Sequence, residues 1–321
     1  MTDAIVVDLT GRRIRVGLDV GGTKIDAVAV APSGEILARH RRQTGWGDDA
    51  VVDSVSSAVI DLSAEAGLSL GDIDSVGIGI PGLVDAVSGR VLHAVNLGVE
   101  SLDLADRVAV RLGATVRVEN DVKAAALGAA SLRAIDGSMA YLNLGTGVAA
   151  GIVVDGAIWR GARGTAGEVG HLSVDPSGRL CGCGQRGCIE TFCGGGALAK
   201  AWGRPGTHPV RDILDAADDG DALAVALRAD LFHGAAAAVR ALVLSADVER
   251  VIIGGGLTAL GARLDAGVRD ALRTGAEASA FMRSLHLDER IELLPLGSPA
   301  AAVGAALVGA TTPLKEIVTH G

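Results

Sequence analysis

All four cysteines of the chain lie in one short glycine-rich segment that also holds a histidine and two glutamates. Cys181, Cys183 and Cys188 follow one another closely, and His171 precedes them. Three thiolates and one imidazole are a ligand set typical of tetrahedral zinc. The glycines among the cysteines let the backbone turn sharply enough for the sulfurs to converge. The spacing therefore predicts a structural zinc site formed by His171, Cys181, Cys183 and Cys188.

Three other arrangements use the same cysteines. Two disulfides are disfavoured because the N-terminus does not have the pattern of a secretory signal, and a Cys-x-Cys pair has poor geometry for a bond. An iron–sulfur cluster is disfavoured because such clusters favour wider spacings. Cys193 could replace His171 as the fourth ligand, although a buried free thiol is the role we favour for it.

The composition places the chain among globular proteins and limits its partners. With 321 residues, 49% hydrophobic and only 2% aromatic, it should form one or two domains with an aliphatic core. The net charge of −9 argues against a nucleic-acid surface. Every apolar run is interrupted by glycine or charge, so we expect no membrane span. The first thirteen residues do not resemble a signal peptide, and a reducing cytoplasm would keep the thiols free for zinc.

The first organised segment is an apolar strand, a glycine turn and a second strand, covering residues 14–30. It is not a P-loop, because the Gly-x4-Gly-Lys pattern is missing and no helix is expected after the turn. Glycines nevertheless allow backbone N–H groups to approach a phosphate. A carboxylate at the end of the first strand can hold Mg²⁺. The candidate phosphate and magnesium residues are Asp19, Gly21, Gly22, Thr23 and Lys24.

A near-repeat of this segment covers residues 140–154, with Gly145, Thr146 and Gly147 in the turn. Two copies of a strand–turn–strand unit indicate two domains of similar ancestry, each offering a phosphate-binding turn to a shared cleft. Between the copies we expect a helix over 50–66, a strand over 75–80 and a strand over 115–119 that runs into a helix over 122–130.

Several polar or glycine residues follow these elements and are candidates for substrate binding. Gly82 could bring backbone close to a ligand, and Asn120-Asp121 stands where a strand ends and a helix begins. Asn120-Asp121 can be read as a helix N-cap. A carboxylate at the carboxyl end of a strand also faces the crevice where α/β proteins bind ligands, so Asp121 is a candidate general base.

The second half is expected to hold one or two helices over 221–245, a strand over 251–253, a helix to about 273, a strand over 291–296 and a helix over 300–309. The turn Gly254, Gly255 and Gly256 after the strand could lie against a nucleotide. The histidines other than His171 show no ligand spacing, and we interpret them as structural or surface groups.

Taken together, these motifs resemble the ROK family of sugar kinases and sugar-responsive repressors. The pattern E-x-G-H…C-x-C-G-x-x-G-C-x-E, the D-x-G-G-T-K turn and N-D followed by A-A-L-G all have counterparts here. The resemblance implies an actin-like (ribonuclease-H-like) duplicated two-domain ATPase fold with an interdomain cleft, divided near residues 121 and 299. It also implies that the zinc ligand His171 binds sugar hydroxyls, together with Glu168, Glu190 and Asn96. The sequence departs from the family's Pro-Asn-Leu motif and following Trp, because Val95 precedes Asn96 and no Trp follows nearby.

The resemblance implies an ATP-dependent hexose kinase that acts on a sugar hydroxyl, with glucose favoured and the 6-OH as acceptor. It would use ATP, Mg²⁺ and structural Zn²⁺, with Asp121 as the general base, and form a homodimer or a dimer of dimers. N-acetylmannosamine, N-acetylglucosamine and fructose are alternative substrates. A repressor is disfavoured because few residues precede Asp19, and a catalytically dead sugar-binding protein is disfavoured by intact Asp19, Lys24 and Asp121.

Overall fold

The computed structural model describes residues 13–310 and divides them into two compact units. Residues 13–128 with 299–310 form the first unit, and residues 129–298 form the second. The first division falls inside a helix, seven residues after the position expected from the sequence. The N-terminal residues judged not to be a signal peptide lie almost entirely outside the described residues, as does His320. The shared cleft expected between the two copies stays a prediction.

The first unit is built on a five-stranded sheet with the order β3-β2-β1-β4-β8. β1 pairs antiparallel with β2, β2 pairs antiparallel with β3, and β4 pairs parallel with both β1 and β8. The strands are rich in Val and Ile, which favour a pleated, buried surface. Their bounds are β1 Ile14–Val20, β2 Lys24–Val30, β3 Ile36–Gln43, β4 Ile73–Ile80 and β8 Thr115–Asn120.

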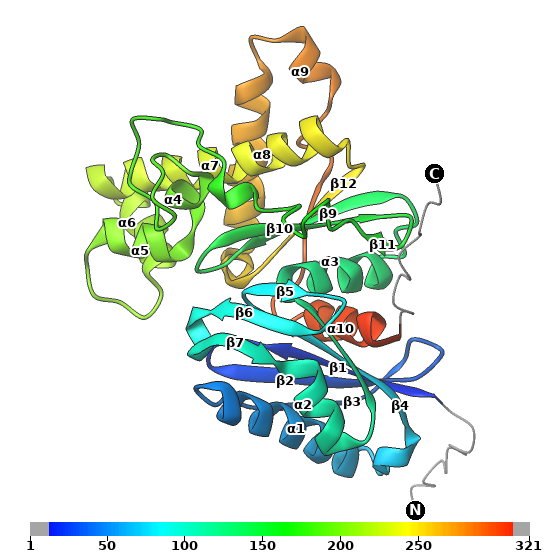
Figure 1. Ribbon diagram of the computed structural model, residues 1–321. Coiled ribbons are helices and arrows are strands. Elements are labelled where there is room, and N and C mark those ends of the chain that lie inside the picture. Colours follow the sequence, from blue (N-terminus) through cyan, green and yellow to red (C-terminus); the bar gives the residue numbers. More distant parts are fainter. Residues whose placement is uncertain (1–12, 311–321) are drawn as a thin grey trace, which may run out of the picture. The chain divides into compact units, whose positions relative to one another are not determined.

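Helices pack on this sheet. α1 (Asp48–Glu65) contacts β2 and β3, and α10 (Ala300–Ala310) contacts β1 and β4, as Figure 1 shows for the red helix. α10 approaches very closely because the strands present glycines: a Cβ on Gly77 would lie 1.7 Å from the carbonyl oxygen of Ala305. α3 (Asp121–Leu132) follows β8 directly, and η1 (Leu70–Asp72) precedes β4.

A small antiparallel sheet of the first unit was not expected from the sequence. It has the order β5-β6-β7, with η2 between the last two strands, and leads into α2. These strands are short and interrupted by polar residues, so no clear period of two marks them. Their bounds are β5 Leu83–Asp85, β6 Arg90–Ala94, η2 Val95–Leu97, β7 Val99–Asp103 and α2 Leu104–Leu112.

The second unit repeats the sheet of the first. Its order is β11-β10-β9-β12-β13, with the first two pairings antiparallel and the last two parallel. The same succession of directions in both units confirms the duplicated α/β fold of the actin-like class. The bounds are β9 Ser138–Leu144, β10 Val148–Val154, β11 Ala157–Ile158, β12 Arg250–Gly254 and β13 Ile291–Leu293.

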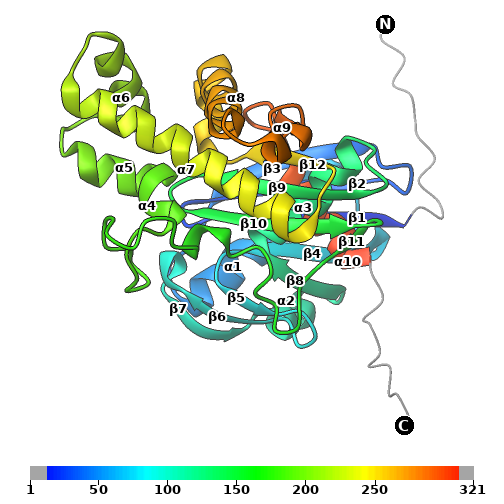
Figure 2. The same cartoon turned by 90° about the horizontal axis from the view of Figure 1, so that it is seen from above.

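The other elements of the second unit pack around its hydrophobic core. The longest of these helices is α7, drawn in yellow-green and yellow in Figure 2. These elements are η3 Val169–His171, α4 Ile189–Cys193, α5 Gly195–Trp202, α6 Pro209–Asp218, α7 Ala222–Ala246, η4 Gly256–Leu260, α8 Ala262–Ala276 and α9 Ala280–Ser284.

The expectation that no apolar segment is long enough to cross a membrane is wrong for α7. By length and composition alone this helix could cross a membrane, since eighteen of its residues have a mean hydropathy of 1.4. Half of those residues are buried inside the protein. Its buried side chains, such as Leu227, Leu231 and Val239, belong to the hydrophobic core of the second unit. The apolar composition therefore has an explanation in core packing, and the helix is weak evidence for a membrane span.

Candidate active site and metal centre

The four candidate zinc ligands converge in the second unit. The ligand atoms of His171, Cys181, Cys183 and Cys188 all lie within 4.8 Å of one another. Sγ of Cys183 and Sγ of Cys188 are 3.7 Å apart, and Sγ of Cys181 is 3.8 Å from Nδ1 of His171. Around one tetrahedral zinc with Zn–S near 2.3 Å and Zn–N near 2.0 Å, these separations are about 3.8 Å and about 3.5 Å. The residues present therefore fit a zinc ion in both chemistry and spacing.

The same geometry assigns the two nitrogens of His171. Nδ1 faces the sulfurs, so the nitrogen that remains for a substrate is Nε2. A ligating imidazole that keeps its other N–H free can orient that group toward a second partner.

The two closest thiols differ in their electrostatics. A hydrogen bond from the backbone N–H of Gln185 lowers the pKa of exposed Cys183 to about 6. Burial raises the pKa of Cys188 to about 12, and its neighbour Cys183 adds to this. A bound zinc ion deprotonates a coordinating thiol outright, so the metal would relieve the cost of holding these sulfurs together.

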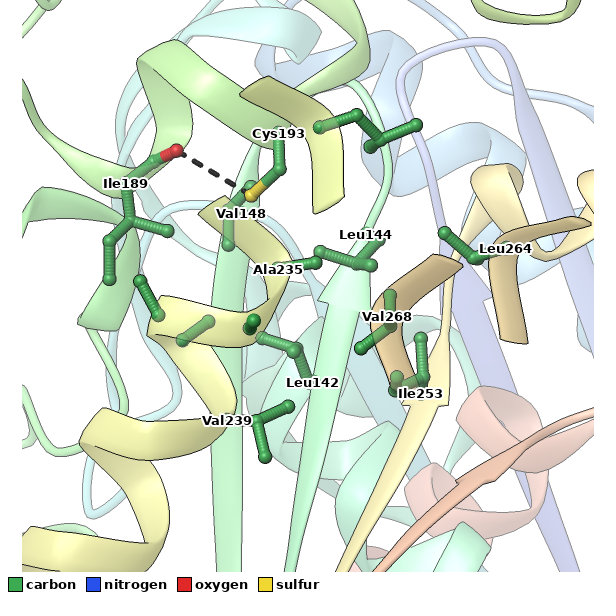
Figure 3. Close-up of a cluster of buried hydrophobic side chains, with 14 of the residues drawn as sticks. Leu142, Leu144, Val148, Ile189, Cys193, Ala235, Val239, Ile253, Leu264 and Val268 are labelled. Atoms are coloured by element: carbon green, nitrogen blue, oxygen red, sulfur yellow. Dashed lines mark hydrogen bonds between the residues drawn. The ribbon is translucent and has the colours of Figure 1, made fainter. Parts of the chain in front are cut away.

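Cys193 lies outside this cluster. It is a buried free thiol among apolar side chains, and its S–H donates to the carbonyl oxygen of Ile189 at 3.5 Å (Figure 3). Burial raises its pKa, which makes the thiol inert. The sulfur of Cys193, the last residue of α4, therefore packs in the hydrophobic core of the second unit.

Two glycines allow the metal loop to fold against its neighbours. Gly187 has a φ of +66°, and a Cβ there would lie 1.6 Å from the carbonyl oxygen of Asp175. A Cβ on Gly170 would lie 1.9 Å from the carbonyl oxygen of Val148 in β10. The glycine before His171 is thus required by the close approach of its backbone to β10.

Arg179 ties the metal loop to two helices. Its Nε donates to the carbonyl oxygen of Thr191 in α4 at 3.0 Å, and its Nη1 donates to Asp230 of α7 at 2.7 Å. The guanidinium also lies over the ring of Phe192, 5.3 Å from the centroid. A cation at the last carbonyls of a helix is favourable, so Arg179 fixes α4 and the glutamate that α4 carries.

That glutamate, Glu190, contacts the second glycine turn. Its Oε2 accepts a hydrogen bond from the backbone N–H of Val148 at 2.9 Å, and a Cβ on Gly147 would lie 2.6 Å from the same oxygen. Glu168 is the N-cap residue of the 3₁₀ helix η3, and His171 is its last residue. Residues three apart in a 3₁₀ helix project in the same direction, so these two side chains lie on one side of the turn. Glu168 is exposed, whereas His171 and Glu190 are half-buried.

A cavity of about 480 Å³ opens beside the same turn, within the second unit. The turn after β9 and the turn after β12 meet here, since a Cβ on Gly255 would lie 2.5 Å from the carbonyl oxygen of Leu144. The volume lies in the range typical of small-molecule sites. Its lining includes Gly145, Thr146, Gly195, Gly196, His208, Arg211, Gly256 and Leu257.

This cavity includes some candidate nucleotide residues and leaves out others. Gly145, Thr146 and Gly256 line it, whereas Gly147 faces Glu190, and Gly254 packs against the ring of Tyr141. Sequence reasoning missed His208 and Arg211, which lie at the start of α6. The sequence signal that could have located the start of α6 is the His208-Pro209 pair, since proline is favoured in the first turn of a helix.

In the first unit, Asn120 and Asp121 differ in how far each caps the helix α3. Oδ1 of Asn120 accepts from the backbone N–H groups of Val122 and Lys123 at 3.1 and 3.2 Å. Its Nδ2 donates to the carbonyl oxygen of Gly82 at 3.3 Å. Asp121 accepts only from the N–H of Val122 among these donors, at 2.9 Å. Asn120 is thus the main helix cap, and the carboxylate of Asp121 beside it is half-buried.

Asp19 stands close enough to Asp121 for the two charges to interact. Burial raises the pKa of Asp19 from 3.8 to about 7, with further increases from Asp121 and Asp26 and an opposing effect of Lys24. Two carboxylates repel one another when they are close together and shielded from water. A divalent cation bound between them would lower this electrostatic repulsion. The donor set therefore fits Mg²⁺, as expected from the end of β1.

The first glycine turn also meets a candidate sugar residue. A Cβ on Gly22 would lie 3.0 Å from the backbone oxygen and 3.3 Å from the Cβ of Asn96. Gly21, Thr23 and Lys24 belong to the same turn, which closes by a hydrogen bond from Gly21 N–H to the Lys24 carbonyl at 2.9 Å. A side chain at position 22 would require the Asn96 segment to shift by a few tenths of an ångström.

Comparison with known proteins decides the family. Residues 15–311 match the ROK family. The chain belongs to the ROK family. A ROK relative named glucokinase, from Halalkalibacterium halodurans, is 30% identical over 310 residues, covering 90% of this chain and 92% of the relative. An N-acetylmannosamine kinase from Haemophilus influenzae is 31% identical over 244 residues, covering 74% of this chain and 79% of the relative.

The crystal structure of a ROK family glucokinase from Streptomyces griseus, in complex with glucose and AMPPNP, has a similar fold. It is 31% identical, with a TM-score of 0.75, and the match covers 92% of this chain and 99% of that chain. The ROK assignment agrees with the resemblance inferred from the motifs, and with the duplicated fold described above.

The raised pKa of Asp19 affects the stability of the metal-free protein. The folded state holds the proton of Asp19 up to pH 7, whereas the unfolded chain releases it near pH 4. Stability is therefore lost as pH rises through this window. We expect Asp19→Asn to raise Tm at pH 8 by at least about 2 °C in the absence of Mg²⁺, and to leave Tm near pH 4 unchanged.

Thermal unfolding from pH 4 to 8 checks this expectation. Asp106→Asn, which removes an exposed carboxylate from the first turn of α2, is the control and should show no such dependence. Added Mg²⁺ should raise the Tm of the wild type more than that of Asp19→Asn. A Tm gain that is equal at every pH would contradict the raised pKa.

Proposed function

We propose that this chain is an ATP-dependent hexose kinase that transfers the γ-phosphoryl group of ATP to glucose, most readily to the 6-OH. The activity is that of a sugar phosphotransferase with an alcohol acceptor. The glucokinase relatives support the reaction class and the favoured substrate.

The observation that carries this proposal is found separately in each unit. In the first unit Gly22 of one glycine turn lies against Asn96, and in the second unit Gly147 of the other turn lies against Glu190. Each unit thus places a candidate phosphate-binding turn in contact with a candidate sugar-binding residue. A kinase needs this arrangement, because phosphoryl transfer depends mainly on holding donor and acceptor close together.

The roles of the other residues follow from their chemistry. The carboxylate of Asp121 accepts the proton of the attacking hydroxyl, while Asn120 holds the start of α3 and donates a hydrogen bond to the sugar or to Gly82. Bound Mg²⁺ would neutralise negative charge on the phosphates. Asp19 would hold this ion, and the N–H groups of the glycine turns would bind phosphate oxygens. The adenosine would occupy the cavity lined by Gly145, Thr146 and Gly256.

The zinc site serves the sugar through His171. Bound zinc would fix Nδ1, so that Nε2–H of His171 donates to a sugar hydroxyl while Glu168 and Glu190 accept from others. Free thiols of this kind need a reducing compartment, and we infer that the enzyme acts in the cytoplasm. The homodimer or dimer of dimers stays a prediction.

N-acetylmannosamine is the second candidate substrate, because a relative with that activity in its name is as similar in identity as the glucokinase. A coupled assay of ADP release over glucose, fructose, mannose, N-acetylmannosamine and N-acetylglucosamine tests both. We expect glucose to have the highest kcat/KM. Turnover of an N-acetylhexosamine alone would assign the second activity, and no turnover of any sugar would overturn the proposal.

A deoxy-sugar series tests the hydroxyl contacts. If Glu168, His171 and Glu190 hold hydroxyls of the bound sugar, an analogue that lacks one hydroxyl leaves the polar group that held it unpaired in the complex. Each loss costs about 1–3 kcal/mol, which is about a 5- to 150-fold lower kcat/KM. Equal kcat/KM values for analogues lacking the hydroxyl at positions 1 to 4 would contradict this pocket.

A further inference from the structure

Trp46 lies beside the Asn96 turn although fifty residues separate them in the sequence. A Cβ on Gly98 would lie 2.6 Å from both Cε2 and Nε1 of Trp46. The indole therefore rests directly on the backbone at Gly98, which has a φ of +68°. All of these residues belong to the first unit.

The segment that carries Trp46 is fixed at both ends. Thr44 donates from its N–H to the carbonyl oxygen of Thr23 at 3.1 Å, and from its hydroxyl to that of Gly21 at 2.8 Å. The N–H of Gly47 donates to the carbonyl oxygen of Leu97 at 2.7 Å. The segment thus connects the phosphate-binding turn to the Asn96 turn, with Trp46 between the two anchors.

The indole itself is largely unburied. Trp46 is 70% exposed and Val95 is 76% exposed, and Asn96 is exposed as well. The other tryptophans are more buried: Trp159 is 47% exposed and Trp202 is 5% exposed. An exposed indole held by a fixed backbone is costly in water, and it gains when an apolar surface covers it.

We propose that Trp46 is a specificity-determining residue of the sugar site, whose indole packs against the C–H face of the hexose held by Asn96. The inference rests on the proposed sugar kinase function. A hexose offers hydroxyls at its edge and C–H groups on its faces, so an amide beside an aromatic ring matches both. Trp46, in the segment between β3 and α1, brings an aromatic ring to the turn that carries Asn96.

Steady-state kinetics of Trp46→Ala and Trp46→Phe test this proposal. An aromatic contact is worth about 0.5–1.5 kcal/mol, so Trp46→Ala should raise the KM for glucose about 2- to 12-fold. We expect kcat and the KM for ATP to stay within about twofold of the wild type, and Trp46→Phe to recover most of the loss. Trp159→Phe, an exposed tryptophan of the second unit, is the matched control.

Fluorescence gives a readout that a merely structural role would not change. Glucose added without nucleotide should alter the emission of the wild type and of Trp159→Phe, and the change should vanish in Trp46→Phe. Unchanged sugar KM in Trp46→Ala, or an equal rise in both KM values, would overturn the role of Trp46 while leaving the kinase activity standing. A wild type that phosphorylates no sugar would instead overturn the proposed function.

Discussion

Replacing Asp121 by asparagine is expected to lower kcat by at least about a hundredfold, while sugar affinity and Tm stay close to those of the wild type. The substitution keeps the size of the side chain but removes its basicity, so the acceptor hydroxyl loses the group that takes its proton. A hundredfold loss corresponds to about 2.7 kcal/mol of transition-state stabilisation.

The structure explains why this variant should fold. The N-terminal cap of α3 is supplied mainly by Oδ1 of Asn120, which accepts from two backbone N–H groups. The amide oxygen at position 121 can still accept from the N–H of Val122, as the carboxylate does. Removing the repulsion between Asp121 and Asp19 also favours the folded state.

Single-turnover and steady-state rates, with a sugar-binding titration, check the result. Asp106→Asn removes a carboxylate from the first turn of another helix and should keep full activity. Normal turnover of Asp121→Asn at saturating substrates would make Asp121 a structural residue. The base would then have to be sought at Glu168 or Glu190.

The second large effect is expected for Cys183→Ser, which should lose the zinc that the wild type holds at about one ion per chain. Without the ion, Nδ1 of His171 is no longer fixed, and we expect kcat/KM for the sugar to fall on the order of 10- to 100-fold. The KM for ATP should change little, because the adenosine cavity is lined by other segments.

Cys183 is the best ligand to replace because it is exposed, whereas Cys181 and Cys188 are buried. The loop is also held by Arg179 and by its contacts with β10, so we expect local disorder and not global unfolding. Elemental analysis and circular dichroism measure the two effects.

Cys193→Ala is the matched control, since its sulfur lies outside the cluster. It should keep the zinc and most of the activity, with a modest loss of stability from the small cavity. Full activity of a zinc-free wild type would show that the metal does not serve the sugar site.

The sequence alone determined the glycine-turn hairpins and the local motifs. Two mostly apolar strands of seven residues on either side of a glycine turn define the β1–β2 and β9–β10 hairpins, because a strand pair with a short turn is set by neighbouring residues. The metal cluster could be predicted from the sequence for the same reason, since three of its ligands fall within one short loop.

The short strands β5 to β7 could not be found in this way. They are brief, partly exposed and stabilised by pairing with one another, so their local pattern carries little information.

Only the tertiary structure decided which distant residues become neighbours. Gly22 meets Asn96, Gly147 meets Glu190, and Trp46 meets Gly98, and none of these pairs is marked by spacing along the chain. Sequence reasoning noted that no tryptophan follows Asn96, whereas folding brings Trp46 to the same turn from the segment between β3 and α1. Likewise His208 and Arg211 reach the cavity because α6 packs there. Such contacts arise from the packing of sheets and helices around a core, which depends on the whole chain and leaves no period in the local sequence.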